Sequence, residues 1–124
     1  MPIEKILIVD DELLIRDFLA ETLRRKNFDV TTAENGNKAI ALLKDNVFDL
    51  VITDMTMPQM TGVRLSEKLM RIRPDVPIII CTGYNAHIDE EGAKKMGVAA
   101  FVVKPIIKHE FAKTIRKAID SKKA

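Results

Sequence analysis

Apolar residues follow two patterns along the chain, short continuous runs and longer segments with an apolar residue at every third or fourth position. The runs have the length and the β-branched composition of strands, and they cover Lys5–Val9, Phe28–Ala33, Leu50–Thr53, Val76–Cys81 and Ala99–Val103. The segments between them predict helices with apolar positions at Leu14, Ile15, Phe18, Leu19 and Leu23, at Ala39, Ile40, Leu43 and Val47, at Leu65, Leu69 and Ile72, and at Ile107, Phe111, Ile115, Ala118 and Ile119. A weaker helix is predicted over residues 85–96, where Glu–Lys pairs four residues apart favour it and Gly92 in its interior opposes it.

The strict alternation of strands and helices predicts an α/β fold, a doubly wound (βα)5 domain with five parallel strands between two layers of helices. The runs at 5–9, 50–53 and 76–81 are apolar almost throughout, as strands buried on both faces must be. The run at 28–33 contains Thr31 and Thr32, and we expect it at an edge of the sheet. No linker or low-complexity stretch is visible, so residues 1–124 are expected to form a single domain.

Composition agrees with a globular protein, because 47% of the 124 residues are hydrophobic and 31% are charged. No apolar run approaches the roughly 20 residues of a membrane helix, and Met1–Glu4 leads directly into a strand, so we expect neither a membrane segment nor a signal peptide. The single cysteine, Cys81, fits a cytoplasmic location and a buried position in a strand. The bases within residues 104–124 occupy the polar positions of a predicted helix, which indicates a solvated face and no direct binding of nucleic acid.

Polar side chains follow four of the five predicted strands. They are Asp10, Asp11 and Glu12 after the first strand, Asp54 after the third, Thr82 after the fourth and Lys104 after the fifth. The carboxyl ends of parallel strands share one edge of the sheet, where open α/β folds bind their ligands, so these side chains can meet there. Each has an ordinary explanation when taken alone: Asp11 as a helix cap, Thr82 as a turn residue and Lys104 as a surface lysine. Their joint occurrence favours a site.

The residue types at this edge suit phosphoryl chemistry. Carboxylates without histidine or cysteine beside them favour a hard cation, and a few carboxylates with room for water suit Mg²⁺. A carboxylate can also act as the nucleophile that forms an aspartyl phosphate, and Asp54 at the centre of the edge is the candidate. The Lys104 ammonium and the Thr82 hydroxyl would then contact other phosphoryl oxygens.

Together, Asp10-Asp11, Asp54 followed by Met57-Pro58 and Gly62, Thr82-Gly83 and Lys104-Pro105 resemble the motifs of the response-regulator receiver domain of two-component signalling, over essentially the whole chain. The resemblance implies a flavodoxin-like three-layer sandwich with the strand order 2-1-3-4-5, the order of the family's chemotaxis regulator. It also implies that Asp54 is the phosphoacceptor and that Mg²⁺ is bound directly by Asp11 and the Thr56 main-chain carbonyl and through water by Asp10. Thr82 and Lys104 would bind the phosphate, and Thr82 with Phe101 would form the switch. The bond between Lys104 and Pro105 would be cis.

By this resemblance, the chain is expected to accept a phosphoryl group from a sensor histidine kinase or a phosphotransfer protein and then to change its affinity for a downstream protein. It would assist its own phosphorylation and dephosphorylation without being an enzyme for other substrates. The expected partner surface comprises the helix at 85–96, the strand at 99–103 and the helix at 108–121.

Two other functions are compatible with the same residues. One is a Mg²⁺-dependent phosphohydrolase with an aspartyl-phosphate intermediate, which is disfavoured because Thr56 stands where such hydrolases place a second acid. The other is a receiver-like scaffold that is never phosphorylated, which the intact set of acids, hydroxyl and lysine speaks against.

Overall fold

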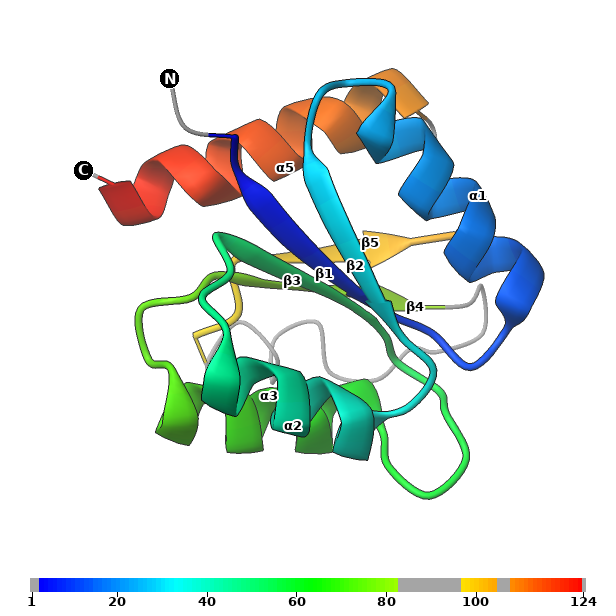
Figure 1. Ribbon diagram of the computed structural model, residues 1–124, viewed down its shortest axis with the longest axis vertical. Coiled ribbons are helices and arrows are strands. Elements are labelled where there is room, and N and C mark those ends of the chain that lie inside the picture. The colour runs from blue at the N-terminus through cyan, green and yellow to red at the C-terminus, as the bar shows by residue number, and fades with distance from the viewer. Residues whose placement is uncertain (1–2, 83–96, 105–107, 124) are drawn as a thin grey trace.

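The computed structural model describes residues 3–82, 97–104 and 108–123 and shows a sheet flanked by helices (Figure 1). The strands are β1 Lys5–Val9, β2 Asp29–Ala33, β3 Leu50–Asp54, β4 Ile78–Thr82 and β5 Ala100–Val103. The described helices are α1 Leu13–Arg24, α2 Gly36–Asp45, α3 Gly62–Ile72 and α5 Lys108–Lys123. The helix predicted over residues 85–96 and the predicted cis bond at Pro105 lie outside the described residues.

All strand pairs in the sheet are parallel, and the order is β2-β1-β3-β4-β5, which confirms the expected order and the place of β2 at an edge. In β1, β3 and β4 nearly every residue is buried, whereas β2 has two half-buried threonines. The register sets the carboxyl ends side by side, because Val9 lies opposite Thr53 and Asp54 lies opposite Cys81.

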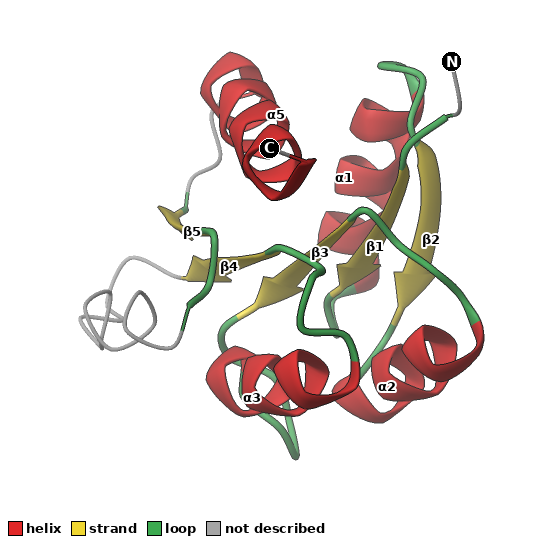
Figure 2. Cartoon of the chain, turned by 90° about the vertical axis from the view of Figure 1, so that its left-hand side faces the viewer, coloured by secondary structure: helices red, strands yellow, loops and turns green. Residues whose placement is uncertain are grey.

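The helices form two layers, α1 and α5 over one face of the sheet and α2 and α3 over the other (Figures 1 and 2). Successive side chains of a strand point to opposite faces, and the central strands are therefore apolar at every position. In β1, Leu7 and Val9 pack in the core on the α2 and α3 side, while Ile6 and Ile8 pack in the core on the α1 and α5 side. The three layers agree with the predicted sandwich.

The sequence pattern overestimated the buried surface of α1. In α1, only Leu19, Ala20 and Leu23 are fully buried, while Leu14 is 83% exposed and Phe18 is 47% exposed. An apolar stripe wider than the face that meets the sheet leaves some of its members in water.

Val47 does not belong to α2 as the pattern predicted, because the helix ends at Asp45 and Asn46 is already extended. The Asn46 main-chain and side-chain N–H groups both donate to Leu42 O, at 2.9 Å each, and so satisfy the last turn.

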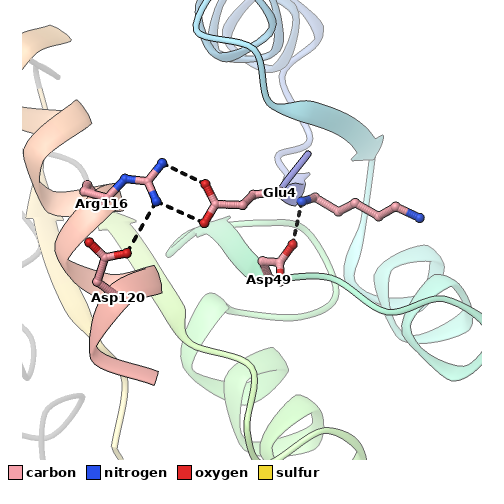
Figure 3. Close-up of polar contacts among 5 residues, drawn as sticks. Glu4, Asp49, Arg116 and Asp120 are labelled. Atoms are coloured by element: carbon pink, nitrogen blue, oxygen red, sulfur yellow. Dashed lines mark hydrogen bonds and ion pairs between the residues drawn. The ribbon is translucent and has the colours of Figure 1, made fainter. Parts of the chain in front are cut away.

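Arg116 of α5 spans the edge of the sheet at the amino ends of the strands and binds Glu4, the residue before β1 (Figure 3). Its Nη2 donates to Glu4 Oε1 at 2.7 Å and its Nη1 to Glu4 Oε2 at 3.0 Å, so the pair is bidentate. Nη1 also contacts Asp120 Oδ1 at 3.4 Å, and the guanidinium lies 5.7 Å from the centre of the Phe28 ring. These contacts attach α5 to the segments that lead into β1 and β2. Of the described helices, none is long and apolar enough to cross a membrane.

Candidate functional site

Asp54 is the last residue of β3, and the strand carries it to the edge of the sheet without releasing it to water. Its exposed fraction is 8%. The Met55 N–H continues the sheet ladder by donating to Cys81 O at 2.7 Å, and the Gly62 N–H donates to Met55 O at 2.7 Å. A Cβ atom at Gly62 would lie 2.5 Å from the Asp54 main-chain oxygen, so only glycine allows α3 to begin this close to the strand.

Asp10, Asp11 and Asp54 form an acid cluster in which one carboxylate oxygen from each residue lies within 4.8 Å of the others. Asp10 is buried and Asp11 is exposed. Burial is the largest effect on Asp10 and raises the pKa of its carboxyl, and the charges of Asp54 and Asp11 raise it further. The hydrogen bond from the Glu12 N–H and the charge of Lys104 lower this pKa, but they do not offset the rise. The Asp10 carboxyl therefore holds its proton more readily than an exposed aspartate, chiefly because it is buried.

Lys104, directly after β5, provides the cationic partner of Asp54. Its Nζ donates to Asp54 Oδ1 at 2.8 Å, and its side chain is 25% exposed. Burial depresses the pKa of the Lys104 ammonium, but the hydrogen bond and the charges of Asp54 and Asp10 outweigh that effect and raise it overall. The ammonium thus stays charged at neutral pH and lies near the carboxylates of Asp54 and Asp10.

An open pocket of about 500 Å³ lies over this cluster, and its lining residues are Asp11, Glu12, Asp54, Thr56, Met57, Pro58 and Lys104. The donor set is entirely oxygen on the acidic side, and burial together with the neighbouring Asp54 and Asp11 charges raises the pKa of the Asp10 carboxyl. Both observations fit a hard divalent cation such as Mg²⁺, which takes carboxylate oxygens and keeps several waters.

Two further predicted residues, Thr82 and Phe101, lie in β4 and β5 and are not among the residues that line this pocket. Thr82, at the end of β4, is fully buried, and its carbonyl accepts the Lys104 N–H at 2.8 Å. Phe101 of β5 is half-buried and packs against the core on the α2 and α3 side.

Cys81, next to Thr82, is buried as predicted, and burial raises the pKa of its thiol to about 12. It is therefore no candidate nucleophile, since the thiolate is the reactive form.

The structure brings together the predicted acids and Lys104, with the Thr82 main chain bonded to Lys104, and it excludes two of the ordinary explanations. The N-cap of α1 is Glu12 and not Asp11, and Lys104 is a half-buried ion-pair partner and not a surface lysine. Sequence reasoning missed the contribution of Arg16, whose Nη1 donates to Asp10 O at 2.8 Å. An arginine one turn into a helix carries no signal of this kind by itself, because its partner is a main-chain carbonyl.

Comparison with known proteins gives a consistent result. The family model described as the response regulator receiver domain matches residues 6–116. The transcriptional regulatory protein GlrR of Escherichia coli is 31% identical over 115 residues, which cover 93% of this chain and 26% of that protein. A response regulator receiver protein of Anaeromyxobacter is 40% identical over 100 residues, 81% of this chain and 42% of that protein. The chain thus spans less than half the length of these relatives.

Solved structures match over nearly their full length. A response regulator receiver domain protein from Clostridium thermocellum superposes with a TM-score of 0.93 at 30% identity, covering 98% of both chains. A CheY-like receiver domain protein from Methanospirillum hungatei superposes with a TM-score of 0.92 at 27% identity, again covering 98% of both.

Proposed function

The chain belongs to the response regulator receiver domain family, whose members are phosphoacceptors in signalling, and on that premise we propose that Asp54 is its phosphorylation site. The observation that carries the proposal is the position of the Asp54 carboxylate. It is held at a strand end, bonded to Lys104 at 2.8 Å, grouped with Asp10 and Asp11, and open to the pocket.

In the proposed reaction, a carboxylate oxygen of Asp54 attacks the phosphorus of a phosphohistidine on a sensor kinase or a phosphotransfer protein. The new O–P bond forms as the N–P bond breaks, and the imidazole nitrogen that leaves keeps the electron pair and takes a proton from water. Lys104 is close enough to bind a phosphoryl oxygen as charge develops, and the Thr82 hydroxyl would bind another. The same residues would assist hydrolysis of the aspartyl phosphate.

We assign the cation site to Asp11, Asp54 and the Thr56 carbonyl as direct ligands and to Asp10 through water. The acid cluster and the place of Thr56 on the pocket wall support this assignment. Bound Mg²⁺ would neutralise the negative charge that the carboxylates and the phosphoryl group share. One Asp10 oxygen accepts the Glu12 N–H at 2.9 Å, which leaves the other to reach the ion through water.

The readout of phosphorylation would run from Thr82 to Phe101. If the Thr82 hydroxyl turns toward the phosphoryl group, the half-buried Phe101 ring can turn inward, and because it has no hydroxyl, no polar group is buried in the process. The downstream partner would then bind a surface formed by β5 and α5, extended by residues 85–96 as the sequence predicts. We do not carry the partners of the longer relatives over to this chain, and we expect it to make no direct contact with nucleic acid.

The hydrolase alternative is not favoured, because the family to which the chain belongs signals through its own phosphorylation. A single assay separates the two activities: the proposed function gives stoichiometric labelling of the protein by acetyl phosphate, whereas a hydrolase turns over many equivalents of a phosphoester.

The phosphorylation site itself is tested with acetyl phosphate and Mg²⁺, followed by borohydride trapping of the acyl phosphate and mapping of the modified residue. Asp54→Asn should abolish labelling, and EDTA should abolish it in the wild type. Asp49→Asn is the matched control, because Asp49 also lies beside the sheet but binds the Lys5 N–H at 2.7 Å at the opposite edge. Undiminished label in Asp54→Asn would contradict the assignment.

The readout is tested by amide hydrogen exchange with and without beryllofluoride, a phosphoryl mimic. Changes are expected in β5 and α5 of the wild type and should be largely lost in Thr82→Ala, which should still accept the phosphoryl group. Changes centred on α1 and α2, or retained in Thr82→Ala, would show that this route of coupling is wrong.

A further inference from the structure

Asp10 is held at three points, and two of them belong to its main chain. Its N–H donates to Ala33 O at the end of β2 at 3.2 Å, its Oδ1 accepts the Glu12 N–H at 2.9 Å, and its carbonyl accepts Arg16 Nη1 at 2.8 Å. The arginine contact is partly buried, and its donor carries a full charge, so it belongs to the stronger class of hydrogen bonds.

The Arg16 bond acts on the peptide unit that joins Asp10 to Asp11. Because a peptide unit is planar, holding its carbonyl oxygen sets the orientation of the plane from which both acids extend. Arg16 itself is anchored in α1, where its N–H donates to Glu12 O at 3.0 Å, and its side chain reaches back over the first turn. The orientation of the two acids is thus tied to the helix.

Besides the two other bonds of Asp10, little among the described residues holds the turn between β1 and α1. Glu12 is the N-cap of α1, and its side chain forms no cap hydrogen bond. The turn also carries strain, because three carboxylates lie within 4.8 Å of one another and like charges repel. Asp11 is exposed and could relieve the repulsion by moving toward water, unless its peptide is restrained.

We propose that Arg16 is a positioning residue for the cation site, which keeps Asp10 and Asp11 at the spacing that a divalent cation needs by holding the Asp10 carbonyl. The inference rests on the proposed function and adds to it a residue that touches neither the cation nor the phosphoryl group. Groups that orient metal ligands in this way typically change metal affinity by about 10- to 100-fold when they are removed.

Arg24 is a matched control in the same helix. Its Nη2 donates to Val30 O at 3.0 Å, which is again a partly buried bond from an arginine of α1 to a main-chain carbonyl six residues away. That carbonyl lies near the amino end of β2, at the edge of the sheet opposite the acid cluster. Loss of the Arg24 bond therefore reproduces the structural cost without touching the turn.

The test is a titration of the metal-free 124-residue chain with Mg²⁺. Binding is measured by calorimetry and by the shifts of the Asp11 and Glu12 amide signals in NMR spectra. Arg16→Met should raise the Mg²⁺ dissociation constant by about tenfold or more. Arg24→Met should leave it within about twofold of the wild-type value, although both variants should lower the thermal unfolding midpoint in EDTA by similar amounts. Arg16→Lys keeps a charged donor and should fall between the wild type and Arg16→Met.

Equal Mg²⁺ affinities of the wild type and Arg16→Met, or equal losses in Arg16→Met and Arg24→Met, would overturn the inference and leave Asp54 phosphorylation untouched. If Arg16→Met does not fold, Arg16→Lys decides the matter, and unchanged affinity in that variant overturns the inference. A wild-type chain that binds no Mg²⁺ would overturn both this inference and the proposed cation site.

Discussion

Two ion pairs lie at opposite edges of the sheet, Lys104–Asp54 beyond the carboxyl ends of the strands and Arg116–Glu4 beyond the amino ends. Both are short, at 2.8 and 2.7 Å, and in each pair the carboxylate is the more buried member. They differ in the balance of charge around them. At the amino edge, Arg116 meets the two oxygens of Glu4 with two N–H groups. At the carboxyl edge, the Lys104 ammonium bonds one of three clustered carboxylates, and the Arg16 guanidinium bonds only the main chain of Asp10.

At the amino edge the paired charges stabilise the fold, whereas under the proposed function the charges at the carboxyl edge serve to bind a cation. A bidentate pair satisfies its own members and leaves little affinity for an added ion. An acid cluster with one ammonium has carboxylate oxygens to spare, and it gains most when a cation arrives. If the carboxyl edge binds a cation as proposed, it exchanges stability for function, as binding sites commonly do.

The largest expected contrast between the two pairs is in phosphorylation rate. Lys104→Met removes the charged donor that would bind the phosphoryl group, and the rate of Asp54 labelling should fall by about 100-fold or more. Arg116→Met, at the other edge, should leave the rate within about twofold of the wild-type value, since it lies outside the pocket. Rates are measured by acetyl-phosphate labelling at fixed Mg²⁺, and equal effects of the two substitutions would remove the functional distinction.

The second contrast is in stability, where we expect Arg116→Met to have a larger effect than Lys104→Met. Arg116→Met leaves the largely buried Glu4 carboxylate without its bidentate partner and should lower the free energy of unfolding by about 1–3 kcal/mol. Urea unfolding at pH 7 measures this change, and a double-mutant cycle with Glu4→Gln isolates the pair. A coupling energy near zero would show that this pair, which is half-exposed on the arginine side, is as weak as an ordinary surface pair.

The charge excess at the carboxyl edge predicts a substitution that stabilises the metal-free protein. Asp10→Asn keeps an oxygen that accepts the Glu12 N–H but removes a buried charge, so the free energy of unfolding at pH 7 should rise by about 0.5–2 kcal/mol. Because the pKa of Asp10 is raised in the folded state, ionisation of this carboxyl costs stability as the pH rises through and above its ordinary pKa of 3.8. The gain from Asp10→Asn should therefore disappear below about pH 4, and a gain independent of pH would contradict the electrostatic cause.

The smallest expected effect comes from an ion pair that belongs to neither edge. Arg25 and Glu21 form an exposed pair on α1 at 2.7 Å, with side chains 77% and 67% exposed. Arg25→Ala should change the free energy of unfolding by less than about 0.5 kcal/mol, because water and salt screen such pairs. A loss as large as that of Arg116→Met would mean that ion-pair geometry outweighs burial in this protein.

Sequence reasoning was most successful where one physical rule decides the outcome. The strand at Lys5–Val9 was predicted to the residue, and the edge position of β2 was also correct. The order of the sheet, which the resemblance to the receiver family implied, is confirmed as well. Continuous apolar runs have few alternatives to burial between two layers of helices. The meeting of Asp54 and Lys104, fifty positions apart, followed from the rule that parallel strands end at one edge.

Sequence reasoning failed where the outcome depends on how elements meet. Leu14 and Phe18 keep helical spacing, but which of the apolar positions face the sheet depends on the rotation of α1, and this is decided by packing. Glu12 as N-cap and the reach of Arg16 depend on the path of a single turn. The spacing of apolar residues does not predict the backbone conformation of this turn, so these contacts were found only in the structure.

Gly62 has a consequence for the direction in which a signal can travel. Its backbone lies against the backbone of Asp54, with no room for a side chain between them, and its N–H is bonded to Met55. The close packing of the start of α3 on the end of β3 leaves little room for relative movement. On the other side, β5 is paired with β4 alone among the described strands. If phosphorylation of Asp54 displaces its surroundings as proposed, we expect the displacement to be larger toward β5 than toward α3.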